Sequence, residues 1–286
     1  MTILVTAAGG QLGHLVVDAL LARGASPDSI VAGARTVAKA ADLADKGVRV
    51  VPLDYTAPES IAAALEGVDS VLLISGSEPG SRVAGHVNVI DAAVRAGVTK
   101  LVYTSLSHAD TADLVLAPDH KATEEAIAAS GIPAVLLRNN WYIENYAGDL
   151  AGAAQTGVLS AAVGDAAVGA AARVDYAAAA AVVLLEDGHI GRTYELAGPR
   201  ATYADIAAAM GEVLGREVVY APATPEELAA RLASFGLDEG TVGFVVALDA
   251  GIASGALDAT ETDLTDLIGR PTTSWVDALR ALAPAA

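Results

Sequence analysis

The sequence predicts an α/β fold in which a doubly wound parallel sheet is joined to a smaller, helix-rich C-terminal lobe. Three observations lead to this prediction. Short apolar segments alternate with amphipathic helical patterns in the first half of the chain, glycines stand where those helices should end, and the first segment runs into a glycine-rich turn. Near-continuous apolar strands separated by helices are typical of a parallel sheet that is covered on both faces.

The first half of the chain should alternate strand and helix throughout. The strands are expected at residues 3–6, 29–34, 48–51, 70–74, 100–104 and 134–137. The helices are expected at residues 12–23, 37–46, 58–65, 83–96 and 119–130. Each helix is followed by a glycine in the position of a C-terminal cap, namely Gly24, Gly47, Gly67, Gly97 and Gly131.

After about residue 147 the alternation becomes less regular. Helices are expected at residues 176–186, 203–214 and 225–235 and again near the end, with short strands at 192–196 and 217–220. Thr202 with Asp205, and Thr224 with Glu227, have the spacing of capping boxes at helix starts. We therefore expect one domain over residues 1–147 and a smaller lobe over residues 148–286, and leave open whether the two are interleaved.

Composition excludes several classes of protein. The 286 residues are 53% hydrophobic, but no apolar run approaches the roughly 18 to 20 residues of a membrane span. The chain has no cysteine and no His pair at helical metal-ligand spacing, so neither a disulfide nor a metal site is expected. A net charge of −18 disfavours nucleic acid and anionic membranes as partners. With no secretory signal visible, we expect a cytoplasmic protein; the oligomeric state, a homodimer included, stays open.

The opening strand and the turn after it predict a nucleotide site. Residues 3–6 are followed by Ala7-Ala8-Gly9-Gly10-Gln11-Leu12-Gly13, after which a helix begins. Glycines let the backbone approach a diphosphate, and the helix N-terminus offers free N–H groups. This arrangement opens the Rossmann-type dinucleotide fold, so residues 1–147 are expected to form an NADP-binding domain. The candidate contacts are Thr6, Gly9, Gly10, Gln11, Leu12 and Gly13; the alternative is a turn that only starts a helix.

The end of the second strand indicates which nucleotide is bound. NAD-binding domains usually place an acid there for the ribose hydroxyl, whereas NADP-binding domains place an arginine nearby. The segment Ala32-Gly33-Ala34-Arg35-Thr36 contains no acid, and Lys39 lies one helical turn beyond Arg35. Both cations are able to face one phosphate, so NADPH is the expected cofactor. The alternative is that both are solvated surface cations.

Further cofactor contacts are expected where later strands end, because ligands of open α/β sheets bind at that edge. Ser75-Gly76-Ser77, after the fourth strand, is assigned to the nicotinamide side, with a plain loop as the alternative. Asp54-Tyr55 is expected to border the adenine. Thr104, Ser105 and Arg138, at the ends of the next two strands, complete the cofactor set.

The catalytic motifs that the chain lacks exclude several classes of reaction. None of the eight tyrosines has a lysine four residues later, and no G-x-S-x-G elbow is present. The remaining reaction is hydride transfer to an acceptor that needs little general-acid catalysis, since the cofactor supplies that chemistry.

The segment after the sixth strand should meet such an acceptor. Only 4% of the chain is aromatic, so Trp141, Tyr142 and Tyr146 mark a flat-ligand pocket, with ordinary core aromatics as the alternative. His120, Tyr142 and Asn139 are the candidate catalytic residues, although His120 also fits an ordinary surface histidine.

A wider set of motifs runs nearly from end to end of the chain. It comprises Gly10-Gln11-Leu12-Gly13-His14, Leu72-Leu73-Ile74-Ser75, Tyr103-Thr104-Ser105-Leu106, His108-Ala109-Asp110-Thr111, Leu137-Arg138-Asn139, Trp141-Tyr142, Glu144-Asn145-Tyr146, Asp175-Tyr176-Ala177-Ala178-Ala179-Ala180, Tyr194-Glu195-Leu196-Ala197-Gly198, Leu267-Ile268-Gly269 and Pro271-Thr272-Thr273. With these motifs the chain resembles the NmrA-like branch of the atypical short-chain dehydrogenases. The resemblance implies a Rossmann domain, a small substrate-side lobe, NADPH in the cleft and a quinone-like acceptor over the nicotinamide. That branch also lacks the catalytic tyrosine and lysine, whose positions fall on Leu116 and His120.

The chain departs from the family pattern at the turn. Ala7 stands where the family has its first glycine, and Gly9 stands where it has a threonine. If the backbone at Ala7 needs a positive φ, its methyl group should weaken cofactor binding without abolishing it. Lys121 replaces an apolar family residue and is a further candidate contact or a neutral change.

Two functions of different classes follow from these observations. The first is an oxidoreductase that transfers hydride from NADPH to a quinone or similar flat, electron-poor acceptor. The second is a catalytically silent NADP(H)-sensing regulatory protein, which Ala7 and the missing proton-donor pair would suit. An azo or imine acceptor is a third possibility.

Overall fold

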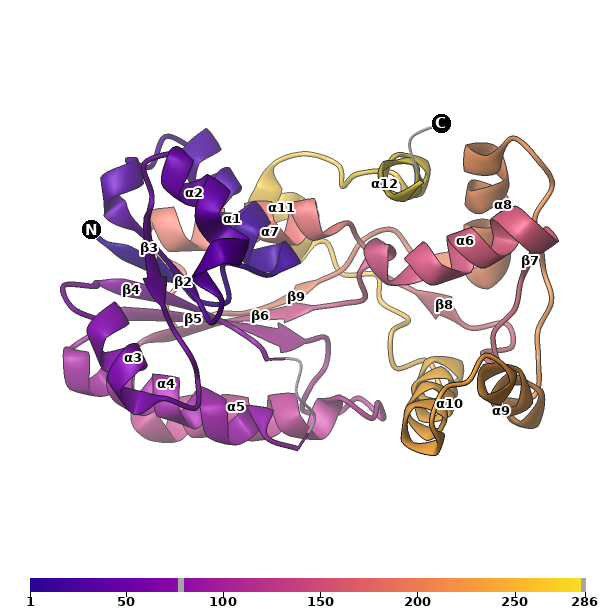
Figure 1. The fold of residues 1–286 in the computed structure, drawn as a ribbon, viewed down its shortest axis with the longest axis horizontal. Helices are drawn as coiled ribbons and strands as arrows, with labels where there is room; N and C mark the ends of the chain where they lie inside the picture. Colours follow the sequence, from indigo (N-terminus) through magenta and orange to yellow (C-terminus); the bar gives the residue numbers. More distant parts are fainter. Residues whose placement is uncertain (77–79, 284–286) are drawn as a thin grey trace.

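A seven-stranded parallel sheet forms the centre of the molecule (Figure 1). The structure, a computed structural model, describes residues 1–76 and 80–283, so Ser77 lies outside the described residues. The strand order is β3-β2-β1-β4-β5-β6-β9, and every neighbouring pair is parallel. The strands are β1 Ile3–Val5, β2 Ile30–Ala34, β3 Arg49–Pro52, β4 Ser70–Ile74, β5 Lys100–Leu106, β6 Ala134–Asn139 and β9 Thr193–Leu196. The order reverses between β1 and β4, where doubly wound sheets bind ligands.

Helices cover both faces of this sheet, which confirms the predicted fold class. One face carries α1 (Gln11–Ala22), α2 (Ala41–Asp45), α7 (Arg173–Leu185) and α11 (Asp263–Ile268), and the other carries α3 (Pro58–Ala64), α4 (Arg82–Ala96) and α5 (Ala117–Ser130). In β4, Leu72 packs into the first helical layer and its neighbour Leu73 into the second, and both side chains are fully buried. Burial on both faces explains why the strands are apolar without alternation.

The expected helix ends are confirmed, with one helix broken. Gly97 and Gly131 cap α4 and α5 in the left-handed conformation that glycine adopts without strain. The expected helix over 37–46 is instead a short 3-10 helix, η2 (Val37–Ala40), followed by α2. Ala40 leaves the helical region between them, with φ −123° and ψ 18°. A second 3-10 turn, η1 (Pro27–Ser29), precedes β2.

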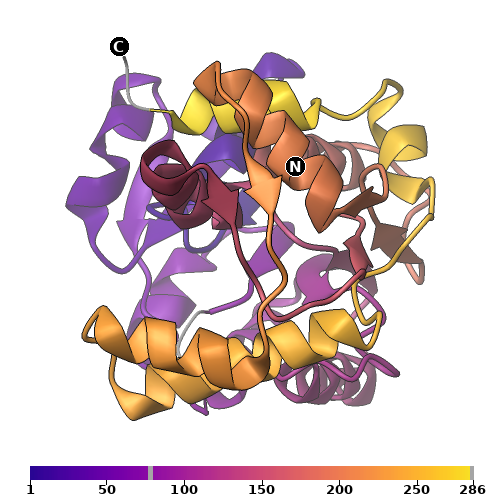
Figure 2. The same ribbon diagram turned by 90° about the vertical axis from the view of Figure 1, so that its right-hand side faces the viewer.

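The smaller lobe is built from residues after β6 and is rich in helices (Figure 2). Its helices are η3 (Ile143–Tyr146), α6 (Ala147–Thr156), α8 (Tyr203–Leu214), α9 (Pro225–Ser234), α10 (Glu239–Ala253) and α12 (Trp275–Leu282). Two small sheets pair β7 (Val158–Leu159) with β11 (Val219–Tyr220) and β8 (Ala167–Val168) with β10 (Ala201–Thr202). Both expected capping boxes are present, at Thr202 with Asp205 and at Thr224 with Glu227.

Part of the second half returns to the central sheet. The strand expected at 192–196 is β9, which lies parallel to β6. Helix α7 packs against α1, and its residues Tyr176, Ala177 and Ala180 are buried in the same core. Small alanine side chains permit this close approach of two helices. The domain boundary near residue 147 stays a prediction, but α7, β9 and α11 lie with the sheet. Within residues 1–76 and 80–283, no helix is both long enough and apolar enough to cross a bilayer.

Candidate functional site

The turn between β1 and α1 is a tight backbone cradle. Ala7 adopts φ 50°, and its carbonyl accepts a hydrogen bond of 2.9 Å from the Gly10 N–H. A Cβ placed on Gly13 would lie 2.5 Å from the Ala7 carbonyl oxygen, so only glycine lets the first turn of α1 lie against the loop. The positive φ that the sequence analysis considered at Ala7 is present, and the residues fit a cradle for a diphosphate.

The strained backbone conformation of Ala7 is part of the folded structure, so it lowers the stability of the fold. We expect Ala7→Gly to raise the free energy of unfolding by about 1 kcal/mol, because a non-glycine residue in the left-handed region costs about 1–2 kcal/mol. Because the strain is part of the folded structure, cofactor affinity should change little, which differs from the expectation from the sequence that the methyl group weakens cofactor binding. Urea unfolding measures the first effect and calorimetry the second. Ala8→Gly is the matched control and should destabilise the protein, since Ala8 is fully buried and has no positive φ.

Beside this turn lies a first cavity of about 420 Å³. Arg35, Thr36 and Lys39 form one wall, and a Cβ added to Gly9 would lie 3.2 Å from the Lys39 Cβ, so the lysine stem lies against the turn. Asp54, with Tyr55, lines another part. Hydrogen bonds from the Thr56 N–H and hydroxyl lower the pKa of Asp54, and the charge of Arg35 lowers it further. The two predicted phosphate-binding cations are thus brought together.

A second cavity, of about 980 Å³, opens at the carboxyl ends of β4, β5 and β6. It shares Ala7, Gly10, Ser75, Gly76 and Arg82 with the first cavity, so these residues mark the passage from one to the other. The predicted site residues that line it are Gly10, Gln11, Leu12, Gly13, Ser75, Gly76, Ser105, His120, Asn139, Trp141 and Tyr142. An elongated ligand would reach from the cations of the first cavity to the aromatic side chains of the second.

His120 lies in this cavity as a buried, neutral ring. Burial, and then the charge of Arg82, lowers its pKa to about 3. Its Nε2 lies 3.5 Å from Arg82 Nη1, which carries protons, and its Nδ1 lies 3.0 Å from the Tyr103 hydroxyl. Nδ1 therefore carries the proton and donates to Tyr103. His120 therefore presents an acceptor nitrogen toward Arg82. Because its side chain is buried, the alternative of an ordinary surface histidine is wrong.

A second buried histidine, His86, orders the same network. The Gly76 N–H donates to His86 Nε2 over 2.9 Å, so its Nδ1 carries the proton and donates to the Thr123 hydroxyl, also over 2.9 Å. Thr123 in turn donates to the Asp119 carbonyl oxygen. Burial, then the charge of Arg82, lowers the pKa of His86 to about 4.

Asn139 and Tyr142 face the cavity from the end of β6. Asn139 Nδ2 donates to the Tyr142 hydroxyl over 3.2 Å, whereas Asn139 Oδ1 is buried without a hydrogen-bond partner in the described part of the chain. A buried amide oxygen without a partner is costly, which indicates a ligand donor at this point. The Arg173 guanidinium lies over the Tyr142 ring, 4.6 Å from its centroid. Burial raises the pKa of Tyr142, so its hydroxyl keeps its proton.

Four predicted site residues line neither cavity. Thr6 is fully buried; it shares a hydrogen bond with the Tyr55 hydroxyl and accepts one from the Ile74 N–H. Thr104 likewise accepts from the Ser75 N–H. Tyr146 packs in the core of the smaller lobe against Trp275, so the alternative of a core aromatic fits it. The fourth is Arg138.

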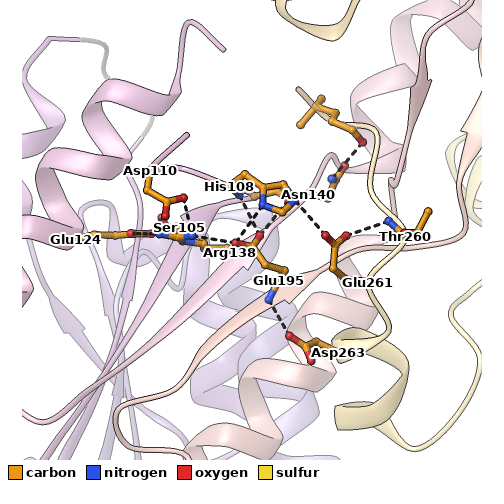
Figure 3. A network of polar contacts seen from close by, with 12 residues as sticks. Ser105, His108, Asp110, Glu124, Arg138, Asn140, Glu195, Thr260, Glu261 and Asp263 are labelled. Atoms are coloured by element: carbon orange, nitrogen blue, oxygen red, sulfur yellow. Dashed lines mark hydrogen bonds and ion pairs between the residues drawn. The ribbon is translucent and has the colours of Figure 1, made fainter. Parts of the chain in front are cut away.

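Arg138 is the centre of an ion-pair network (Figure 3) and lines neither cavity. Its guanidinium donates to Glu124 through two nitrogens, at 2.9 and 2.7 Å, and to Asp110 and Glu195 at 2.9 Å each. Glu195 also accepts from the N–H of His108, whose ring contacts Glu261. The hydrogen bonds to Glu124 raise the pKa of Arg138 further above its usual range. Arg138 holds the ends of β6 and β9 and helix α5 together, and Lys121 beside this network is exposed.

Sequence reasoning missed several residues of the cavities. Arg82, Arg173, Thr241 and Phe244 line the second cavity, the last two from α10. Arg82 follows the loop after the fourth strand, so a cation at the ligand edge of the sheet was an available signal. No sequence pattern connects residue 244 with that edge.

The chain is similar to known proteins over nearly its whole length. The model of the NmrA-like family matches residues 1–247. Quinone oxidoreductase 2 of Escherichia coli strain K12 is 43% identical to this chain over 281 residues, which are 98% of each protein.

Solved structures give the same result. The crystal structure of the Escherichia coli NADPH-dependent quinone oxidoreductase in complex with NADPH has a TM-score of 0.93, with 98% of this chain and 99% of that chain covered. The triphenylmethane reductase of Citrobacter sp., complexed with NADP(H), has a TM-score of 0.93 at 36% identity, over 99% of this chain and 100% of that chain. The chain belongs to the NmrA-like family.

Proposed function

We propose that this protein is an NADPH-dependent oxidoreductase that transfers hydride to a quinone or a similar flat, electron-poor acceptor. One observation carries the proposal. Two connected cavities run from the cations Arg35 and Lys39, past the glycine turn, to a pocket lined by Trp141 and Tyr142. The similarity to a quinone oxidoreductase and to a triphenylmethane reductase, both solved with the phosphorylated cofactor, supports it.

Arg35, Lys39 and the glycine turn would hold the cofactor. Arg35 and Lys39 suit the 2′-phosphate, and the backbone of Gly9, Gly10 and the first turn of α1 suits the diphosphate. Asn139 Oδ1 offers a buried acceptor for an amide N–H group. When bound, the reduced nicotinamide supplies a hydride. Trp141 and Tyr142 would hold the ring of the acceptor.

Turnover tests the proposal directly. Purified protein is mixed with NADPH and a panel of benzoquinones, naphthoquinones and cationic dyes, and the loss of nicotinamide absorbance is followed against the rate without protein. Protein-dependent oxidation with at least one quinone is expected. Absence of turnover with every acceptor, while NADPH still binds by calorimetry, would favour the catalytically silent NADP(H)-sensing protein, which the strained Ala7 and the lack of a Tyr-x-x-x-Lys pair suit.

The choice of cofactor rests on Arg35 and Lys39. Replacing both with alanine should weaken NADPH binding at least 10-fold, since a hydrogen bond to a charged group contributes about 1.5–3 kcal/mol. The dissociation constant for NADH should change by much less. Titration with both nucleotides measures the difference, and the Arg23→Ala, Lys46→Ala pair, outside both cavities, is the control. Equal losses for both nucleotides would mean that other residues bind the 2′-phosphate.

Other aspects of the function stay predictions. A cytoplasmic location and the lack of nucleic-acid binding rest on the sequence alone. The acidic net charge of −18 supports the last of these, since it repels phosphate backbones.

A further inference from the structure

Arg82 is a buried cation at the passage between the two cavities. It is the first residue of α4, its side chain is only 6% exposed, and it lines both cavities. Burying an unpaired guanidinium is costly, so a protein keeps one only where its charge is compensated or used. The partners of Arg82 therefore decide what it does.

Those partners leave part of the guanidinium free for a ligand. Arg82 Nε lies 3.2 Å from an Asp119 carboxylate oxygen, but it makes no hydrogen bond of acceptable geometry within the described residues. Nη1 reaches His120 Nε2 only at 3.5 Å. An arginine has five N–H donors in a planar fork, so its hydrogen-bonding capacity is incompletely used. Nε is buried beside Asp119, so a ligand oxygen in the second cavity would bind at Nη2, which makes no hydrogen bond within the described residues.

The positive charge of Arg82 acts on His120, which lines the second cavity. After burial, it is the next cause that lowers the pKa of His120, whose ring lines the cavity, and of His86 behind it. Both rings are neutral and add no second charge. Asp119, whose side chain is 31% exposed, is the counter-charge on the far side of the fork.

A second arginine that lines the second cavity, Arg173, already has several partners. Arg173 lies over the Tyr142 ring, donates to Asn145 Oδ1 at 2.9 Å and has Glu144 at 3.7 Å. Its contacts hold it in place beside Tyr142. Of the two, Arg82 is the more deeply buried, with 6% of its side chain exposed against 15% for Arg173.

We propose that Arg82 is a catalytic residue that stabilises the negative charge developing on an oxygen of the acceptor. This inference rests on the proposed function. In that reaction the acceptor gains a hydride as the nicotinamide is oxidised, an electron pair moves onto an acceptor oxygen, and this oxygen later takes a proton from water. A fixed cation in a buried site stabilises such charge without reorganisation. Arg82 thereby supplies positive charge at a site that lacks a tyrosine–lysine pair.

Kinetics provide the first test. Arg82→Met should lower kcat for a benzoquinone by about 100- to 1000-fold, as loss of one group that stabilises an oxyanion does. The dissociation constant for NADPH should stay within a few-fold of its original value. Arg95→Met, in the last turn of the same helix and exposed, is the control and should leave kcat unchanged. A raised NADPH dissociation constant with unchanged kcat would overturn the proposal, because Arg82 would then bind only the cofactor.

The second test does not need turnover. 4-Nitrophenol is bound to protein saturated with NADP⁺, and its ionisation is followed by the absorbance of the phenolate. Binding should lower the pKa of the probe by about 1–3 units, as an opposite charge within about 4–6 Å does. Arg82→Met should abolish this shift, Arg82→Lys should keep part of it, and Asp119→Asn should enlarge it. A merely structural role of the pair would not produce opposite effects from its two members.

The two tests separate this inference from the proposed function. If no quinone is reduced but the probe shift is present and depends on Arg82, the proposed function fails and the anion-stabilising role of Arg82 stands. If quinones are reduced but Arg82→Met and Arg82→Lys, both folded by circular dichroism, leave kcat and the probe shift unchanged, the inference is overturned. Absence of the shift in the original protein also overturns it.

Discussion

Replacing Arg138 with methionine is expected to lower the free energy of unfolding by about 3–5 kcal/mol, as removal of one partner of a buried ion pair does. The Arg138 side chain is 11% exposed, and those of Glu124 and Glu195 are 10% and 17% exposed. Without Arg138 these two carboxylates would keep their charge away from water and without a counter-ion. Urea unfolding at neutral pH measures the loss.

The chain contains a matched control for this experiment. Arg200 forms the same two-nitrogen pair with Asp258, at 2.6 and 2.9 Å, but on the surface. Arg200→Met should change stability much less, because exposed ion pairs are screened by solvent. Adding Glu124→Gln to Arg138→Met should recover part of the loss. Equal effects of the two arginine substitutions would show that burial of the Arg138 network contributes nothing.

Acidification should destabilise the fold through His86 and His120. Their pKa values are lowered to about 4 and about 3, while an unfolded histidine titrates near 6.5. Below pH 6.5 the unfolded state therefore binds more protons than the folded state, so stability falls as pH falls toward 4. At pH 5.5 each histidine should cost about 1.4 kcal/mol, and the pair about 3 kcal/mol, relative to pH 7.5.

Variants separate these histidines from the carboxylates that also titrate. Unfolding by urea is measured at pH 7.5 and pH 5.5 for the original protein, for His86→Gln and for His120→Gln. Each variant should be less stable at pH 7.5 but lose about 1.4 kcal/mol less between the two pH values. His14→Gln, at the surface beside Asp42, is the control. A loss on acidification that is the same in all four proteins would contradict the assignment.

The sequence predicted most of the central sheet because its signals are local. An apolar strand, a helical period and a capping glycine each lie within one segment, and β4 and α8 have the expected bounds. Placement of β9 was not predictable in this way. Its sequence pattern is that of any short strand, and its position beside β6 depends on α7 packing against α1.

Some residues of the candidate site were predictable from the sequence and others were not, because only some of the signals are local. Glycines of the turn and Arg35 with Lys39 belong to one strand–turn–helix unit, so local spacing sufficed to place them. Arg138 lies at the end of a sheet strand, as a ligand residue would, yet three carboxylates from distant segments hold it outside both cavities. His120 resembled a surface residue because nothing local shows that Tyr103 and Arg82 enclose it.

By itself, the sequence determined the alternation of strands and helices, the cradle at residues 7–13 and the cationic pair that suits a 2′-phosphate. Only the tertiary structure decided that Ala7 takes a positive φ, that Asn139 keeps an unpaired buried oxygen and that Arg82 stands between the two cavities. The physical reason is that periodicity and turn chemistry act between neighbours in the chain. Burial, charge and hydrogen-bond satisfaction instead depend on which distant segments the folded chain brings together.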